Sequence, residues 1–255
     1  QRQMCIRDRY MTVNRPGAAS QIGTRHAINN NTLLITSFVQ VFVANSDMQE
    51  DMRKLIDNEL EIVAAVGVMP SVLICNKDLN IKTIDDLKNY PKILNFGTNG
   101  PTSSSHLTTE VLFRTINKKH NYVFYPSGQA KISNDLIGGH LDCAFGLLSG
   151  MSAALQSPKV HAVISSHKVD TNTPSWEEVL KTKFPFNNVM GLTVSRNMSA
   201  ADKNKIKSDL AAALAKPEAK TKIENAGFLF YPRLSSSEIA NEIKHIGEIK
   251  KYFAN

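Results

Sequence analysis

The sequence lacks the motifs by which most enzymes and metal proteins are identified. No GxGxxG segment, no Gly-Lys-Ser/Thr ending of a P-loop and no GxSxG turn occur among its 255 residues. The seven histidines show neither HxH nor HExxH spacing, and the three cysteines, Cys5, Cys75 and Cys143, include no CxxC pair. These absences argue against a nucleotide enzyme, a serine hydrolase, a metal site and a disulfide scaffold. We therefore expect no catalysis, no cofactor and no metal.

Long apolar runs and clustered charge are also missing. No apolar run reaches 18 residues, so the sequence predicts no membrane span. The formal net charge of +7 permits anionic partners, but the basic residues are dispersed and the aromatic residues lie in expected strands. Nucleic-acid binding, which needs basic clusters with interleaved aromatics, is therefore not expected. The 42% of hydrophobic residues is enough for a buried core in one large domain or two small ones.

What the sequence does contain is an alternation of strand and helix patterns. Short β-branched or apolar runs predict strands over 33–37, 71–75, 93–96, 122–125, 142–145, 161–164, 189–194 and 228–231. Between them, helix starts are indicated by caps at Thr83 and Ser199, by the serines at 103–105 and by Pro217. This alternation predicts an α/β fold.

The segment with the clearest chemical signal is Asn95–Leu107, in which a strand ends in a glycine-containing loop that leads into a hydroxyl-rich helix start. Backbone N–H groups and the positive end of the helix dipole favour a carboxylate at such a place, and Gly97 and Gly100 let the backbone approach it. A simpler interpretation remains open, in which Thr102 or Ser103 only caps the helix and Gly100 only turns the chain.

A second strand end of the same kind is Tyr125–Lys131, with Ser127 and Gly128 at the start of the next helix. Strand ends that lead into helix N-termini are where α/β proteins bind ligands. Two such turns on one sheet should converge on one crevice, so we expect both to contribute to one site.

The first nine residues, QRQMCIRDR, show no apolar periodicity before the strand-like pattern begins at Tyr10. They resemble a translated sequencing adaptor, so we expect residues 1–9 to be a non-native segment, although an ordinary frayed terminus is the alternative. With that interpretation, the native residues that precede Tyr10 are missing from this sequence.

Several segments together resemble the tripartite tricarboxylate transporter substrate-binding proteins, the Bug-type periplasmic solute receptors. The matching segments, in the same order along the chain, are Val13–Ala18 with Ile22 and Gly23, Asn31–Leu34, Leu94–Gly97 with Ser103–Leu107, Tyr125–Gly128, Asp135–Gly139 with Leu141 and Asp142, and Lys216–Glu218 with Ala226 and Gly227. The resemblance covers residues 10 to 255, and it implies that the protein is N-terminally truncated and lacks its signal peptide and the first strand and helix of the family's fold.

The resemblance implies a two-lobed α/β Venus flytrap of the periplasmic-binding-protein type (type II), with strands crossing between the lobes. Residues 10–94 and 188–255 would form lobe 1 and residues 95–187 lobe 2, with Ser71–Cys75 and Val189–Val194 as the crossing strands. The implied ligand-binding residues are Thr98, Thr102, Ser103, Ser104 and Ser105 on the carboxylate loop, Ser127 and Gly128 on the facing turn, and Thr36 and Ser37 from lobe 1.

The function implied is a periplasmic, monomeric receptor that captures a small carboxylate, such as a di- or tricarboxylate, and delivers it to the membrane permease subunits of a tripartite transporter. Where the family commonly has an acidic residue or asparagine, this chain has Gly146-Leu147-Leu148, so we expect the far end of the ligand to be held differently. Two alternatives remain open from the sequence: a ligand-sensing module of the same fold and an enzyme on this scaffold.

Overall fold

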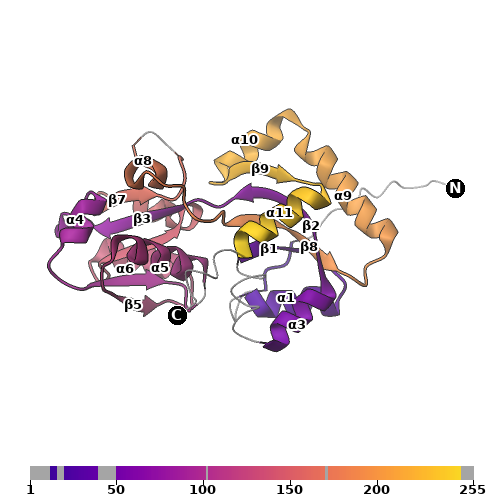
Figure 1. Cartoon of the computed structure of the whole chain (residues 1–255), viewed down its shortest axis with the longest axis horizontal. Helices are drawn as coiled ribbons and strands as arrows, with labels where there is room; N and C mark the ends of the chain where they lie inside the picture. The colour runs from indigo at the N-terminus through magenta and orange to yellow at the C-terminus, as the bar shows by residue number, and fades with distance from the viewer. Residues whose placement is uncertain (1–11, 16–19, 40–49, 102, 170–171, 248–255) are drawn as a thin grey trace.

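The computed structural model describes residues 12–15, 20–39, 50–101, 103–169 and 172–247. Their helices and strands form two bodies that lie next to each other along the long axis of the molecule (Figure 1). One body contains a four-stranded sheet of order β1-β8-β2-β9 and the other a five-stranded sheet of order β5-β4-β6-β3-β7. We call them the four-stranded lobe and the five-stranded lobe.

The four-stranded lobe is antiparallel throughout. Its strands are β1 (Leu34–Ser37), β2 (Leu60–Val68), β8 (Val189–Ser195) and β9 (Leu229–Arg233), and its helices are α1 (Gln21–Asn29), α3 (Glu50–Glu59), α9 (Ala200–Leu214), α10 (Pro217–Asn225) and α11 (Ser236–Gly247). Ile206 of α9 packs with Val63 of β2 and Val194 of β8 in one apolar cluster, so α9 covers one face of this sheet. The cap predicted at Ser199 and the first-turn position predicted for Pro217 are confirmed.

The five-stranded lobe is a mixed sheet in which β4 runs parallel to β5 and β6, while β3 is antiparallel to β6 and β7. Its strands are β3 (Ser71–Asn76), β4 (Leu94–Thr98), β5 (His120–Phe124), β6 (Cys143–Leu147) and β7 (Val160–Ser165). Its helices are α4 (Ile84–Asn89), α5 (Ser104–Ile116), α6 (Gln129–Gly138), α7 (Ser152–Leu155) and α8 (Trp176–Leu180), with 3-10 turns η3 (Lys77–Leu79) and η4 (Leu148–Met151). A capping box at Thr83 starts α4, as predicted.

Both faces of the five-stranded sheet are covered by helices. Phe96 and Phe145 pack with Val111 of α5 in one apolar cluster, whereas Ile74 and Ala144 pack with residues of α6 and α7 in another. A sheet buried on both faces carries apolar residues at successive positions, which is why its strands were recognisable as short apolar runs.

The chain crosses between the lobes at positions other than those expected. The segment Ser71–Cys75 pairs with β6 and β7, so residues 71–94 share a sheet with residues 95–187, not with lobe 1 as the resemblance implied. The first crossing is at Met69–Pro70, and the return is at Asn187–Asn188. The two crossings are joined, because the Met69 amide donates to the Asn188 carbonyl over 2.8 Å. We call residues 69–70 and 187–188 the hinge.

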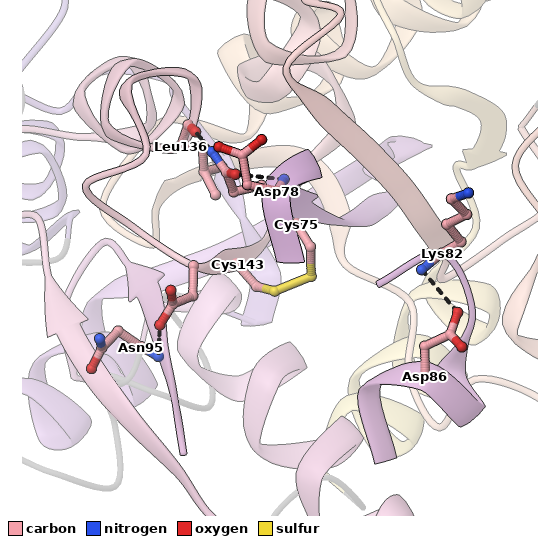
Figure 2. The surroundings of a disulfide bond; sticks show 9 residues. Cys75, Asp78, Lys82, Asp86, Asn95, Leu136 and Cys143 are labelled. Atoms are coloured by element: carbon pink, nitrogen blue, oxygen red, sulfur yellow. Dashed lines mark hydrogen bonds between the residues drawn. A yellow bond between two sulfur atoms is a disulfide. The ribbon is translucent and has the colours of Figure 1, made fainter. Parts of the chain in front are cut away.

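A disulfide joins Cys75 of β3 to Cys143 of β6 (Figure 2). Both side chains are fully buried. The sequence argued only against a disulfide scaffold and did not predict this single bond. The bond can form because the sheet register places the two residues directly opposite each other, although they are 68 positions apart in sequence. Cys5 lies outside the described residues.

The register also decides which edge of the five-stranded sheet faces the hinge. Ser71, the first residue of β3, pairs with Leu147, the last residue of β6, and the Leu148 amide donates to the Pro70 carbonyl over 2.8 Å. Because β4 and β5 run parallel to β6, all three strands end at the edge where the chain enters from the four-stranded lobe. Ligand sites of parallel sheets lie at such carboxyl ends.

Candidate ligand-binding site

The β4–α5 loop is held closed by the hydroxyls of two buried serines. Ser103 caps α5 by accepting the His106 amide and donates its hydroxyl proton to the Gly100 carbonyl over 2.8 Å. The Ser103 and Ser105 oxygens lie 3.0 Å apart, and Ser105 accepts the Asn99 amide over 3.1 Å. Since the Ser103 proton is directed to Gly100, the Ser105 proton is directed to Ser103. Both hydroxyls therefore stabilise the loop and have no proton left for a ligand.

The N-terminus of α5 still offers donors. The amides of Ser104 and Ser105 have no acceptor among the described residues, as the geometry of a first helical turn requires. Ser104 is partly exposed, whereas Ser105 has 1% of its surface exposed. α5 has 13 residues, so its dipole favours an anion at this end. The simpler capping interpretation of Ser103 is correct for its side chain, and it is compatible with an anion site built from these amides.

The facing turn lies beside this loop. The Tyr125 amide donates to the Thr98 carbonyl over 2.8 Å, which joins the end of β5 to the end of β4. Gly128 has a φ of 99°, a conformation that favours glycine, and no atom lies within 4 Å of where a Cβ would be. Two helix N-termini, those of α5 and α6, therefore follow adjacent strands at one sheet edge.

Asp135 of α6 fixes the base of the turn. The Tyr125 hydroxyl donates to Asp135 over 2.9 Å, and the Lys131 ammonium pairs with the other carboxylate oxygen over 2.6 Å. The hydrogen bond from Lys131 holds the pKa of the Asp135 carboxyl below its usual range, while burial raises the pKa of Tyr125 to about 12. This acid therefore stays ionised and engaged with its own helix.

Three polar atoms at this edge are buried without a partner among the described residues: Thr98 Oγ1, Asn99 Oδ1 and Gln129 Nε2. Gln129 was not predicted from the sequence. Its side chain lies against Gly150, where an added Cβ would collide with it, and its Nε2 is 3.2 Å from where a Cβ of Gly146 would be. Gly150 therefore makes room for a glutamine from α6. Buried polar atoms without partners are rare and mark places where a ligand or water completes the bonding.

The remaining predicted residues are placed elsewhere or not described. Thr102 lies outside the described residues. Ser37 lies at the hinge and donates its hydroxyl to Asn188 Oδ1 over 2.6 Å. Thr36 pairs with Gly191 in the sheet and lines a cavity of about 1050 Å³ beside β1, which is also lined by Leu34 and Ile206. The described contacts of Thr36 and Ser37 are therefore with β8, this cavity and the hinge, not with the β4–α5 loop.

Titratable groups flank the site on α5 without entering the loop. Burial lowers the pKa of the His106 imidazole, and the Glu110 carboxylate partly offsets this effect. Glu110 itself accepts from the Tyr122 hydroxyl over 2.7 Å and from Arg114 over 3.0 Å, so its charge is already engaged. Within the described part of the chain, no group of His, Cys, Asp and Glu could hold a metal ion.

Comparison with known proteins identifies relatives of this fold and sequence. Residues 11–249 match the model of the tripartite tricarboxylate transporter family receptor. Protein BugT of Bordetella pertussis is 30% identical over 135 residues, which cover 49% of this chain and 41% of that protein. The matched segment thus spans less than half the length of that curated relative.

Solved structures give the same fold. Rpa4515 of R. palustris, solved with adipate, matches with a TM-score of 0.84 at 17% identity, covering 95% of this chain and 85% of that one. MatC of Rhodopseudomonas palustris, with bound malate, has a TM-score of 0.79 at 19% identity, with coverages of 93% and 85%. The periplasmic binding protein BugD has a TM-score of 0.73 at 18% identity, with coverages of 94% and 82%. These likenesses confirm the predicted periplasmic-binding-protein fold.

Proposed function

Because this chain belongs to the tripartite tricarboxylate transporter family of receptors, we propose that it is an extracytoplasmic receptor that captures a small carboxylate and delivers it to a membrane permease. The observation that carries the proposal is the convergence of two helix N-termini, at Ser104 and Gln129, on the sheet edge that faces the hinge. A ligand held there touches the five-stranded lobe and lies in the path of the other lobe as the two approach.

The ligand class follows from the donors at this edge. Residues 97–105 and 125–129 contain no lysine or arginine, so a carboxylate is held by amides and hydroxyls and not by an ion pair. We assign one carboxylate to the amides of Ser104 and Ser105 and to the turn at Ser127 and Gly128. Two structural neighbours were solved with the dicarboxylates adipate and malate, which supports a dicarboxylate for this protein as well.

An extracytoplasmic location fits one further observation. The disulfide between Cys75 and Cys143 is typical of proteins that fold in an oxidising compartment such as the periplasm. None of the described helices is long and apolar enough to cross a membrane. The proposal is of a monomeric periplasmic receptor that needs no cofactor and performs no catalysis, with permease subunits as its partners.

The test is a calorimetric titration of the protein with adipate, malate and citrate, each paired with the corresponding amide. At least one acid should bind, and its amide should bind roughly a hundredfold more weakly, because two charge-assisted hydrogen bonds become neutral ones. Native mass spectrometry of gently purified protein adds an unbiased search for a retained acid. If no acid is retained or bound, or if an amide binds as tightly as its acid, the proposal is wrong.

A further inference from the structure

A chain of hydrogen bonds connects the two lobes at the hinge. In the five-stranded lobe, the Ser71 amide donates to the Ser166 hydroxyl oxygen over 2.8 Å, and that oxygen lies 2.9 Å from His167 Nδ1. His167 Nε2 lies 3.0 Å from Asn187 Oδ1 in the returning segment. Asn187 Nδ2 donates to Glu242 of α11 over 3.4 Å, in the four-stranded lobe. We call this chain, from Ser71 to Glu242, the hinge relay.

With a neutral His167, the relay has one consistent arrangement of protons. Glu242, 6% exposed, accepts both from Asn187 and from the Tyr231 hydroxyl of β9, 3.0 Å away. Because the amide nitrogen of Asn187 donates to Glu242, its oxygen must accept a proton from His167 Nε2. His167 Nδ1 is then the acceptor for the Ser166 hydroxyl, whose oxygen already accepts the Ser71 amide. In this arrangement His167 is neutral with its proton on Nε2, and the Ser166 hydroxyl has its acceptor in Nδ1.

The surroundings of His167 offer little support for a positive charge. Its ring centre lies 6.0 Å from that of Phe184, and its only polar partners in the relay are a hydroxyl and an amide. The Asn187 side-chain amide separates His167 from the Glu242 carboxylate, which also accepts from the Tyr231 hydroxyl. The Arg233 guanidinium lies over the Tyr231 ring, 3.6 Å from its centre. The neighbouring Lys168 is itself cationic and is paired with Glu178.

We propose that His167 is a pH-sensitive element of the hinge, which ties the lobes in the arrangement seen here only while its ring is neutral. A proton on Nδ1 would remove the acceptor of the Ser166 hydroxyl and place a charge beside Phe184. Both costs are relieved when the ring turns to water, and this movement breaks its bond to Asn187. Acid therefore shifts the protein towards an arrangement in which the lobes are no longer tied through the relay.

The direction of the pH dependence follows from burial. Burial lowers the pKa of His167, and the hydrogen bond with Asn187 offsets this only in part. The released ring, in water, has its ordinary pKa of about 6.5. The relay therefore contributes its full stabilisation above about pH 6.5 and loses it as the pH falls from there towards the lowered pKa. His106 and His120, whose pKa values burial also lowers, lie on α5 and β5 and take no part in the relay.

The test is a distance distribution between spin labels at Lys92→Cys in the five-stranded lobe and Lys222→Cys on α10, in a Cys5→Ser background without ligand. Both label sites are exposed. Between about pH 7.5 and about pH 5, the ratio of the two lobe arrangements should change about tenfold for each unit by which the His167 pKa differs between them. The variant His167→Gln, which donates but cannot be protonated, should keep one distribution at both pH values. The matched control His120→Gln should change as the parent does.

A second variant tests the inference even if the His167 substitution prevents folding. Asn187→Ala removes the tie and leaves the histidine, so its distribution at about pH 7.5 should already match that of the parent at about pH 5. The inference is wrong if the distances in the parent do not change with pH, or if the distances in His167→Gln change as those in the parent do. It is also wrong if Asn187→Ala and the parent, both at about pH 7.5, have the same distance distribution. Since no ligand is present, these results are independent of the proposed function.

Discussion

Replacing Ser104 by proline is expected to weaken carboxylate binding by roughly ten- to a hundredfold, which corresponds to about 1.5–3 kcal/mol for a lost charge-assisted hydrogen bond. Ser104 is the first residue of α5, where proline is well tolerated. The preceding Ser103 has φ −64° and ψ 157°, the extended region that proline imposes on its predecessor. The substitution therefore removes one donor N–H while leaving the helix intact, and calorimetry with the bound acid measures the loss.

Two controls separate the amide from other effects of the substitution. Ser104→Ala keeps the amide and loses only the hydroxyl, so it should bind more tightly than Ser104→Pro. Ala200→Pro places proline at the same position of α9, after a Ser199 cap with φ −58° and ψ 147°, and should leave affinity unchanged. If Ser104→Pro and Ala200→Pro bind the acid equally well, the amide of Ser104 is not a ligand donor.

Ser105→Ala is expected to behave differently from the Ser104 variants. The Ser105 hydroxyl accepts the Asn99 amide and donates to Ser103, so its removal loosens the loop instead of deleting a ligand contact. Affinity and stability should therefore fall together, and the pattern of losses should distinguish the residue that shapes the site from the one that binds.

Reducing the Cys75–Cys143 disulfide is expected to lower the free energy of unfolding by about 4 kcal/mol. The bond closes a segment in which the cysteines are 68 positions apart, and in the chain-entropy model a loop of that size restricts the unfolded state by this amount. The free energy of unfolding in urea is measured for two samples of the wild-type chain, one oxidised and one refolded with reductant. The comparison measures the effect of the disulfide without a substitution.

The control for this experiment is Cys5→Ser, which keeps the disulfide and should unfold at the same urea concentration as the parent. A refolded, fully reduced protein with an unchanged midpoint would mean that the cross-link does not form or does not restrict the unfolded chain. A reduced protein that fails to refold would agree with the burial of both sulfur atoms within the β3–β6 pair.

The strands and helix starts were predictable because their signals are local. Thr83 and Ser199 cap helices through bonds to residues three positions ahead, and the buried strands of the five-stranded sheet are short apolar runs. The long strand β2, Leu60–Val68, was missed, because its alanines and glycine are weak strand formers and its burial by neighbouring elements decides its structure.

The remaining corrections depend on contacts that are distant in sequence. Whether Ser71–Cys75 belongs to one lobe or the other is decided by its pairing with β6, and the same pairing creates the disulfide. The strand end and helix start that flank the β4–α5 loop were predictable from glycine and serine spacing, and anion binding there stays a prediction. The separate roles of Ser103, Ser104 and Ser105 could not be predicted from the sequence, because they depend on which hydroxyl faces Gly100 and which faces Asn99.

The central claim is that a carboxylate binds at the N-termini of α5 and α6, and amide chemical shifts measured during a titration with the bound acid test it most directly. The account predicts that the largest changes occur at the amides of Ser104, Ser105 and Gly128, and that they saturate with the calorimetric affinity. Largest changes at Gly23 and Leu34, which line the cavity beside β1, with Ser104 and Ser105 unmoved, would contradict it.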